Sequence, residues 1–143
     1  MQLSARKPTN PAYPRELKAL GNHLRKRRLD LGLLQRDVAR ILGVSEASVW
    51  QWENNQTKPR VSLVPRVYDF LGYAPYAPTD RLGDWLRQAR RGLGLSRRKL
   101  AAKLRMDVTT IDRWERGRGQ PTAASLARIR RVLDRFSRVN RTG

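Results

Sequence analysis

The chain contains one unit of sequence twice, and this internal repeat restricts the possible fold more than any other feature. A shift of 62 positions aligns the two copies without a gap. The matching positions are mostly apolar residues, glycines and a Trp-Glu pair, and the residues between them differ. Shared structural positions with changed surroundings indicate one fold used twice with two different surfaces. The matches are Leu20/Leu82, Gly21/Gly83, Leu24/Leu86, Arg28/Arg90, Leu31/Leu93, Gly32/Gly94, Leu33/Leu95, Ala39/Ala101, Leu42/Leu104, Trp52/Trp114, Glu53/Glu115 and Pro59/Pro121.

Within the first copy, the apolar residues recur at the spacing of amphipathic helices. Leu20, Leu24 and Leu31 form one stripe, and the glycine that follows is a residue type at which helices stop. A second helix is expected over about residues 35–42, again ending at a glycine, Gly43. Its inward-facing residues are expected to be Val38, Ile41 and Leu42.

A third helix follows in each copy after a short turn. Ser45 and Asp107 can cap it by accepting a backbone N–H, and Asn55 and Gly117 tolerate positive φ at its end. Two short helices joined by such a turn, with a small alanine where they cross, form a helix-turn-helix. A further helix over about residues 63–71 and 123–136 closes each bundle. The predicted fold is therefore all-α, with two tandem small helical bundles that each contain a helix-turn-helix.

The charge of the chain indicates an acidic partner. Lys and Arg total 31 against 12 Asp and Glu, a formal net charge of +19. Residues 1–80 hold thirteen basic and seven acidic groups, whereas residues 81–143 hold eighteen and five. Such an excess repels itself unless a polyanion neutralises it, so the second half should depend more on phosphates. A membrane surface is a weak, nonspecific alternative.

Several protein classes are excluded by what the sequence lacks. It has no cysteine, so disulfides, thiolate zinc sites and thiol catalysis are excluded, and an intracellular location is the default. We see neither a signal-peptide hydrophobic run nor an apolar stretch of the roughly 18–20 residues that span a bilayer. With one histidine, no carboxylates paired on one helix face and no glycine-rich phosphate loop, the sequence predicts no enzyme, no cofactor, no metal site and no membrane partner. The expected location is the cytoplasm, in association with the nucleoid.

The repeated unit resembles a known family. LGLLQRDVARILGVSEASVWQWENNQTKP, residues 31–59, looks like the helix-turn-helix of Cro and phage C1 repressors, the XRE family, and LGLSRRKLAAKLRMDVTTIDRWERGRGQP, residues 93–121, looks like a second member. The resemblance implies a lambda repressor-like fold and transcription regulation. It also implies that Arg28 pairs with Glu53, and Arg90 with Glu115. The predicted organisation is a basic arm over 1–16, domain 1 over 17–72, a linker over 73–80, domain 2 over 81–136 and a basic tail over 137–143.

The third helix of each copy is the expected DNA-reading element. If Val49 and Trp52 face the core, helix geometry turns other side chains outward, and the first part of such a helix enters a major groove. The outward sets are Glu46, Ala47, Trp50, Gln51 and Asn54 in copy 1, and Val108, Thr109, Asp112, Arg113 and Arg116 in copy 2. The resemblance places base contacts at Glu46, Ala47, Ser48 and Gln51, and at Val108, Thr109, Thr110 and Arg113. Together with the expected phosphate contacts, the DNA-binding candidates are Gln35, Arg36, Glu46, Ala47, Ser48, Gln51, Asn54, Lys58, Arg97, Arg98, Val108, Thr109, Thr110, Arg113, Arg116 and Arg118.

These side chains have different chemical preferences. Gln51 suits adenine N6 and N7, Arg113 suits guanine O6 and N7, and Val108 or Thr109 suits a thymine methyl group. Glu46 fits either a cytosine amine or a simple role as an acid at a helix N-terminus. Trp52 and Trp114 are expected in the core, whereas Trp50 and Trp85 are compatible with packing or, for Trp50, with a sugar-phosphate edge.

Both copies depart from the family pattern. Arg105 stands where copy 1 has the turn glycine, and a side chain in a left-handed turn costs roughly 1–2 kcal/mol. Arg97 stands in place of Gln35, the residue that in the family meets a phosphate at the start of the second helix. Leu34 occupies a position that favours a capping Ser or Thr, which Ser96 supplies in copy 2.

Three functions agree with this sequence. The first is a sequence-specific regulator that binds double-stranded DNA, a repressor for example, with two unequal reading heads. The second keeps copy 1 on DNA and makes copy 2 a module for homodimerisation or protein docking, as suggested by Arg105, Asp107 and Asp112. The third is a nonspecific nucleic-acid or RNA binder. Arg6 and Lys7 of the proline-containing arm suit either a minor groove or simple attraction to phosphates.

Overall fold

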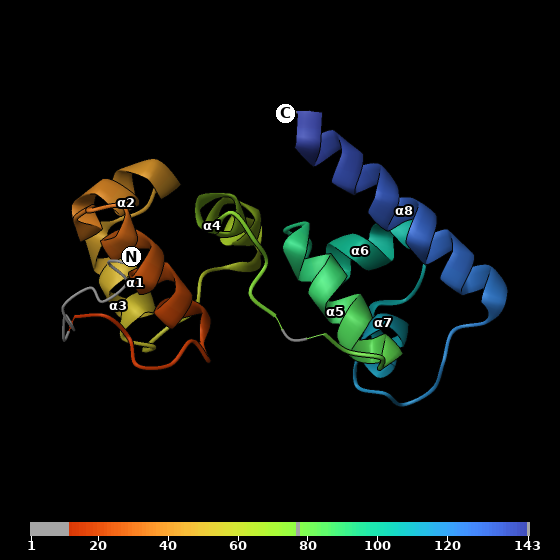
Figure 1. Cartoon of the computed structure of the whole chain (residues 1–143). Coiled ribbons are helices and arrows are strands. Elements are labelled where there is room, and N and C mark those ends of the chain that lie inside the picture. Colours follow the sequence, from red (N-terminus) through yellow and green to blue (C-terminus); the bar gives the residue numbers. More distant parts are fainter. Residues whose placement is uncertain (1–11, 77, 143) are drawn as a thin grey trace, which may run out of the picture. The chain divides into compact units, whose positions relative to one another are not determined.

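Every regular element of the described chain is helical (Figure 1). The computed structural model describes the backbone of residues 12–76 and 78–142, and side chains up to residue 135 within these ranges. The elements are α1 (Leu20–Asp30), α2 (Gln35–Leu42), α3 (Glu46–Glu53), η1 (Val61–Leu63), α4 (Val64–Leu71), α5 (Leu82–Gly92), α6 (Arg97–Leu104), α7 (Val108–Glu115) and α8 (Ala123–Thr142). Since the described residues contain no strand, the all-α prediction is confirmed. Arg6 and Lys7 lie outside the described residues.

The chain divides into two compact units, Met1–Lys58 and Pro59–Gly143. The first contains α1–α3, and the second contains η1 and α4–α8. Helix α4, which the sequence suggests as the closing helix of the first bundle, packs against α5 within the second unit. The predicted end of domain 1 at residue 72 stays a prediction.

The core of the first unit is built from one face of each of its three helices. Leu24, Val38, Ala39, Leu42, Val49 and Trp52 are at most 6% exposed. Two residues expected inside are exposed instead: Leu31 at 47% and Ile41 at 57%. Leu31 follows the last residue of α1, where the chain turns away from the helix face. Ile41 lies about 100° around α2 from the centre of the face formed by its buried residues, so it points away from the core.

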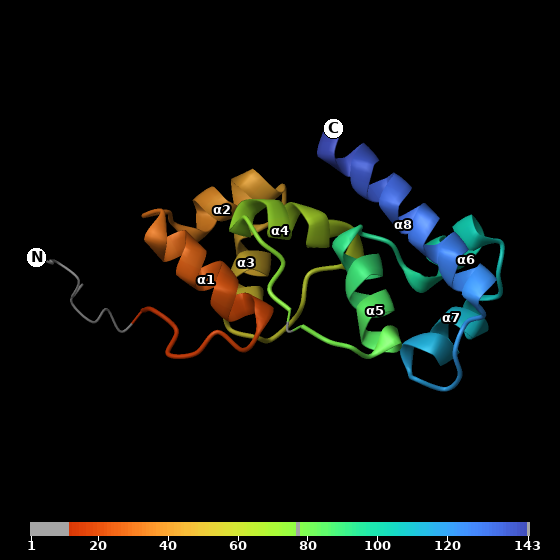
Figure 2. The same cartoon turned by 45° about the vertical axis from the view of Figure 1, so that its right-hand side comes forward.

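The core of the second unit has the same plan with one additional helix. Leu86, Leu95, Leu100, Ala101, Leu104 and Ile111 form a cluster that Ile129 and Leu133 of α8 complete. Helices α6 and α8 contact each other and lie side by side in both views (Figures 1 and 2). Helix α8 ends at Thr142, beyond the expected end at 136, and it includes most of the segment predicted as a tail. Neither Gly nor Pro occurs between Ala123 and Thr142 to interrupt it.

Candidate nucleic-acid interface

In each unit, a side chain caps the start of the second helix of the helix-turn-helix, α3 or α7. The Ser45 hydroxyl accepts a hydrogen bond from the Ser48 amide at 3.1 Å, and the Asp107 carboxylate accepts one from the Thr109 amide at 2.8 Å. Both caps were expected from the sequence. The bonds to Thr109 lower the pKa of Asp107, the backbone amide having the larger effect and the hydroxyl the smaller. The cap therefore favours the charged form of this carboxyl.

The turn before each of these helices requires a left-handed residue. Gly43 occupies it in the first unit with φ 70° and ψ 37°. Arg105 occupies the same place in the second unit with φ 54° and ψ 47°, as the sequence predicts. A side chain in this region of backbone space costs roughly 1–2 kcal/mol, which the surrounding packing has to offset.

The first member of each helix-turn-helix is capped differently. Ser96 accepts from the Lys99 amide at 3.1 Å, as a Ser at that position should. Leu34 has no acceptor in its side chain, and its own amide donates to Asp37 at 2.8 Å. Helix α2 thus has only the second half of a capping box.

An ion pair connects α1 to the end of α3. Arg28 donates from Nε to one oxygen of Glu53 at 2.7 Å and from Nη2 to the other at 2.9 Å. Its third donor reaches the Leu33 carbonyl at 3.1 Å, so one guanidinium joins α1, the following loop and α3. Gln35 adds an amide donor to Glu53 at 3.2 Å. The Glu53 side chain is 2% exposed, and a bidentate arginine is the kind of partner that such a buried carboxylate needs.

The second unit repeats this pair and strengthens it. Arg90 donates to Glu115 at 2.6 and 3.1 Å and to the Leu95 carbonyl at 2.8 Å. The side chains of Arg90 and Glu115 are 5% and 1% exposed. Arg97 adds a second guanidinium, with Nε 3.0 Å from Glu115 Oε1. Two cations therefore hold the carboxylate at the end of α7, where the first unit uses one cation and one neutral amide.

A glycine lets α1 approach the end of α3, and another lets α5 approach the end of α7. A Cβ built on Gly83 would stand 2.5 Å from the Trp114 carbonyl oxygen and 2.8 Å from that of Glu115. One built on Gly21 would overlap the Trp52 carbonyl oxygen. With the ion pairs, these contacts fix the last turns of α3 and α7 against the interior, so that their opposite faces lie on the surface.

The outer face of α3 carries the residues expected there. Glu46, Ala47, Gln51 and Asn54 are exposed, and Val49 and Trp52 are buried. Trp50 is 46% exposed. Two of the polar candidates are engaged inside the helix-turn-helix: the Ser48 hydroxyl bonds that of Ser45 at 2.9 Å, and the Asn54 amide donates to the Trp50 carbonyl at 2.8 Å.

The outer face of α7 differs in composition and partly in orientation. Thr109, Arg113 and Arg116 are exposed, and Thr110 is half-buried. Val108 is not fully outward: it packs against the core cluster as a partly buried residue. The first turn of α7 lies close to the core at Val108, so an apolar side chain at this position can pack against the core.

The acids of α7 have intramolecular partners. Asp112 lies 3.0 Å from Nε of Arg116 and 3.7 Å from Nε of Arg97. Asp107 is occupied as the cap of the helix. A free carboxylate here would repel a phosphate backbone. The charge of Asp112 is instead neutralised by arginines, and that of Asp107 stabilises the N-terminus of α7.

Comparison with known protein families identifies a helix-turn-helix in both halves of the chain. A family model described as a helix-turn-helix domain matches residues 19–77, and a second model described as helix-turn-helix matches residues 86–136. The chain is a tandem helix-turn-helix protein. Both halves resemble the Cro/C1 (XRE) type, and such domains indicate a DNA-binding regulator rather than an enzyme. No curated protein and no solved structure matches the chain significantly.

The basic candidates of this tandem helix-turn-helix protein fall into two groups. One group has exposed side chains: Arg36 and Arg98 lie in the first turns of α2 and α6, and Lys58 and Arg118 follow the ends of α3 and α7. Gln35 and Arg97 instead point their donors at the buried glutamates Glu53 and Glu115. Within the described residues, no cluster of His, Cys, Asp or Glu could hold a metal ion, and no helix is long and apolar enough to cross a bilayer.

Some contacts of the tandem helix-turn-helix protein could not be read from the sequence. Trp114, expected in the core, is partly buried and packs against the edge of the cluster, as does Trp85. The Arg130 guanidinium lies 5.8 Å from the ring centroid of Trp85. Arg128 donates to the Leu104 carbonyl at the end of α6. The two α8 contacts depend on the angle at which α8 crosses its neighbours, and no local motif encodes this angle.

Proposed function

We propose that this protein is a sequence-specific regulator that binds double-stranded DNA inside the cell, with two recognition helices that read different bases. The observation that carries the proposal is the contrast between equivalent frameworks and unlike surfaces. Both units use the same turn, ion pair and glycine contact, yet α3 exposes Glu46, Ala47 and Gln51 while α7 exposes Thr109 and Arg113.

The exposed side chains support specific chemistry at each helix. An amide at Gln51 matches the donor and acceptor of an adenine edge in the major groove. A guanidinium at Arg113 matches the two acceptors of guanine, and the Thr109 methyl group suits a thymine methyl. Because the first turn of a recognition helix enters the groove, the remaining candidates Ala47, Ser48, Thr110 and Val108 would lie near the base edges.

Phosphate contacts would come from the exposed cations that flank these helices. Arg36, Lys58, Arg98 and Arg118 are exposed, and in a chain with a net charge of +19 they would position DNA without selecting its sequence. The larger positive excess of residues 81–143 would make the second unit contribute more to the salt dependence of binding.

A second candidate function assigns DNA to the first unit and protein docking or homodimerisation to the second. It is motivated by the left-handed Arg105, which presents a guanidinium at the turn where the first unit has a bare glycine. The acids Asp107 and Asp112 support it less, since both have structural partners within the second unit.

Selection of bound sites from random duplex DNA tests the proposal with four full-length variants. Gln51→Ala and Arg113→Ala should each relax preference at their own base pair, at a cost of about 1–3 kcal/mol for the preferred site. The controls Lys58→Ala and Arg118→Ala should weaken all sequences alike and reduce the slope of log K against log salt by about 1 each.

The outcome separates the candidates. If Arg113→Ala changes neither preference nor affinity while Gln51→Ala changes both, the second unit does not read bases and the docking function is favoured. If all four variants cause only uniform losses, the protein binds nucleic acid nonspecifically and the proposal is wrong.

A further inference from the structure

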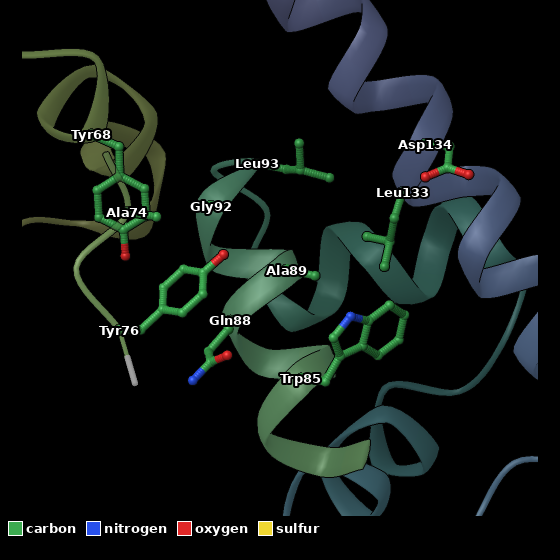
Figure 3. Close-up of a pocket in the computed structure, with 10 residues that line it drawn as sticks. All are labelled: Tyr68, Ala74, Tyr76, Trp85, Gln88, Ala89, Gly92, Leu93, Leu133 and Asp134. Atoms are coloured by element: carbon green, nitrogen blue, oxygen red, sulfur yellow. The ribbon is translucent and has the colours of Figure 1, made fainter. Parts of the chain in front are cut away.

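A cavity of about 350 Å³ opens along α5 in the second unit (Figure 3), and none of the residues that line it in the described chain belongs to α7. One face of α5 forms its floor. Tyr68 of α4 and Tyr76 of the following segment line one side, and α8 lines the other. This volume lies at the lower end of the range of small-molecule pockets. The lining residues are Tyr68, Ala74, Tyr76, Trp85, Gln88, Ala89, Gly92, Leu93, Leu133 and Asp134.

The floor is hollow because α5 carries small residues there. Ala89 and Gly92 lie three positions apart on the face between the Tyr and Trp walls. A Cβ on Gly92 would come within 3.8 Å of Tyr68 Cε2, an ordinary contact, so the backbone geometry does not demand glycine at this position. The missing side chain leaves space instead.

The first repeat shows that the fold does not require this surface. At the equivalent positions of α1, 62 residues earlier, the chain has His23, Lys26, Arg27 and Asp30 in place of Trp85, Gln88, Ala89 and Gly92. The equivalent helix thus carries His, Lys, Arg and Asp at these positions in one copy, and Trp, Gln, Ala and Gly in the other. The hollow face is a particular property of the second unit.

Aromatic rings dominate the walls. The rings of Tyr68 and Tyr76 lie 6.4 Å apart between centroids and are inclined by 55°. Burial raises the pKa of the Tyr68 hydroxyl, which therefore stays protonated at neutral pH. Trp85 lies across the floor from them, and the Arg130 guanidinium lies 5.8 Å from its ring centroid, so the face of this ring that remains open is apolar.

The charge of the lining selects among ligands. Among the residues whose side chains the structure describes, Asp134 is the single charged one that lines the cavity, in a chain with 31 basic and 12 acidic residues. Its carboxylate stands at the rim next to Leu133 (Figure 3). An exposed carboxylate at the rim of a cavity lined by three aromatic rings suits a cation with a flat apolar body. Positive charges of the chain more than roughly 8 Å away are screened at physiological salt.

We propose that this cavity binds a small protonated aromatic amine. The ring of the ligand would lie on Ala89 and Gly92 between Tyr76 and Trp85, and its ammonium group would donate to Asp134. The site is separate from the DNA-reading surface and does not depend on the proposed function.

Three probes of similar size test this site on the full-length protein: 2-phenylethylammonium, the neutral 2-phenylethanol and the anionic 3-phenylpropanoate. The shift of the Trp85 indole N–H in a ¹H–¹⁵N spectrum, assigned with Trp85→Phe, reports binding. For ligands with so few heavy atoms, we expect a Kd between about 0.1 and 10 mM for the amine. A partly exposed ion pair should favour the amine over the alcohol about threefold to fivefold. The carboxylate should bind weakest.

Two variants identify the groups responsible. Asp134→Asn should remove the preference for the amine but leave alcohol binding in place, whereas the charge-matched control Asp80→Asn should leave the preference intact. Tyr76→Ala, at a residue that is 47% exposed and outside any helix, should weaken all three probes without unfolding the unit.

Other results would overturn the proposal. These are equal binding of 3-phenylpropanoate and the amine, an unchanged Kd in Tyr76→Ala, or no indole shift up to 50 mM amine, about five times the weakest expected Kd. Sedimentation that shows a dimer dissociated by Tyr76→Ala would mean that a second copy of the chain covers the cavity, and would equally reject a small-molecule site.

Discussion

Replacement of Glu115 by Gln removes the charge that holds the end of α7 while keeping its shape. The Arg90 guanidinium, with 5% of the side chain exposed, then has a neutral amide in place of its carboxylate partner. Loss of one partner of a buried pair costs about 3–5 kcal/mol, because the remaining charge is left uncompensated. By size alone, the second unit should have a stability of about 4–13 kcal/mol, so this single change would consume much of it.

The first unit provides the matched comparison. In Glu53→Gln, the cation left behind is Arg28, whose side chain is 12% exposed, and the other donor is the neutral amide of Gln35. Easier access to water should make this loss smaller than the loss at Glu115, where two guanidiniums converge. Replacement of both Arg90 and Glu115 by Met and Leu should recover most of the stability, since no charge is then buried.

Urea unfolding of the full-length variants, followed by tryptophan fluorescence and circular dichroism, measures these differences. We expect two transitions in Glu115→Gln, with the second unit unfolding first. A loss below about 1 kcal/mol, the range of exposed ion pairs, would refute the reasoning. So would a larger loss in Glu53→Gln, or a double variant that is no more stable than the single one.

Four further changes have expected outcomes that standard methods can check. Arg105→Gly should raise the stability of the second unit by about 1 kcal/mol in urea unfolding, because it relieves a left-handed side chain, and no gain would mean that the turn is unstrained. Gly83→Ala should lower it by about 1–3 kcal/mol, since the new methyl group meets the Trp114 carbonyl; a neutral effect would contradict the close approach. Leu34→Ser should stabilise α2 by about 1 kcal/mol by supplying the missing cap, as measured by thermal denaturation. The pKa of Asp107 is lowered by its cap, so the stabilisation is complete above the ordinary Asp pKa and is lost as the pH falls through the lowered value; an Asp107→Asn variant should lack this acid dependence in a pH titration by NMR.

The repeat and its helical spacing were sufficient to predict most of the framework. The boundaries of α2 agree with the predicted range, and both N-caps and the left-handed Arg105 are where the sequence places them. These features are local, since each depends on a few neighbouring residues and on the known preferences of caps and turns.

The differences arise where a property depends on packing between elements. Ile41 looks like a core residue in sequence, but the inward face of α2 is already filled by Val38, Ala39 and Leu42. Trp114 sits at the edge of its cluster rather than inside it. The second guanidinium on Glu115 and the cavity along α5 likewise depend on tertiary geometry, for which a single sequence has no local signal. Which of the exposed residues contact DNA stays a prediction for the same reason.

Each recognition helix is anchored to the interior of its own unit by an arginine, a glutamate and a glycine that take no part in its outer face. A change in the outer face of one helix therefore leaves the packing of the other undisturbed. The residues on the outside of α3 could be grafted onto α7 at an offset of 62 without altering either anchor. Under the proposed function, a protein built in this way can acquire a new half of its target one helix at a time, and the two halves need never be symmetric.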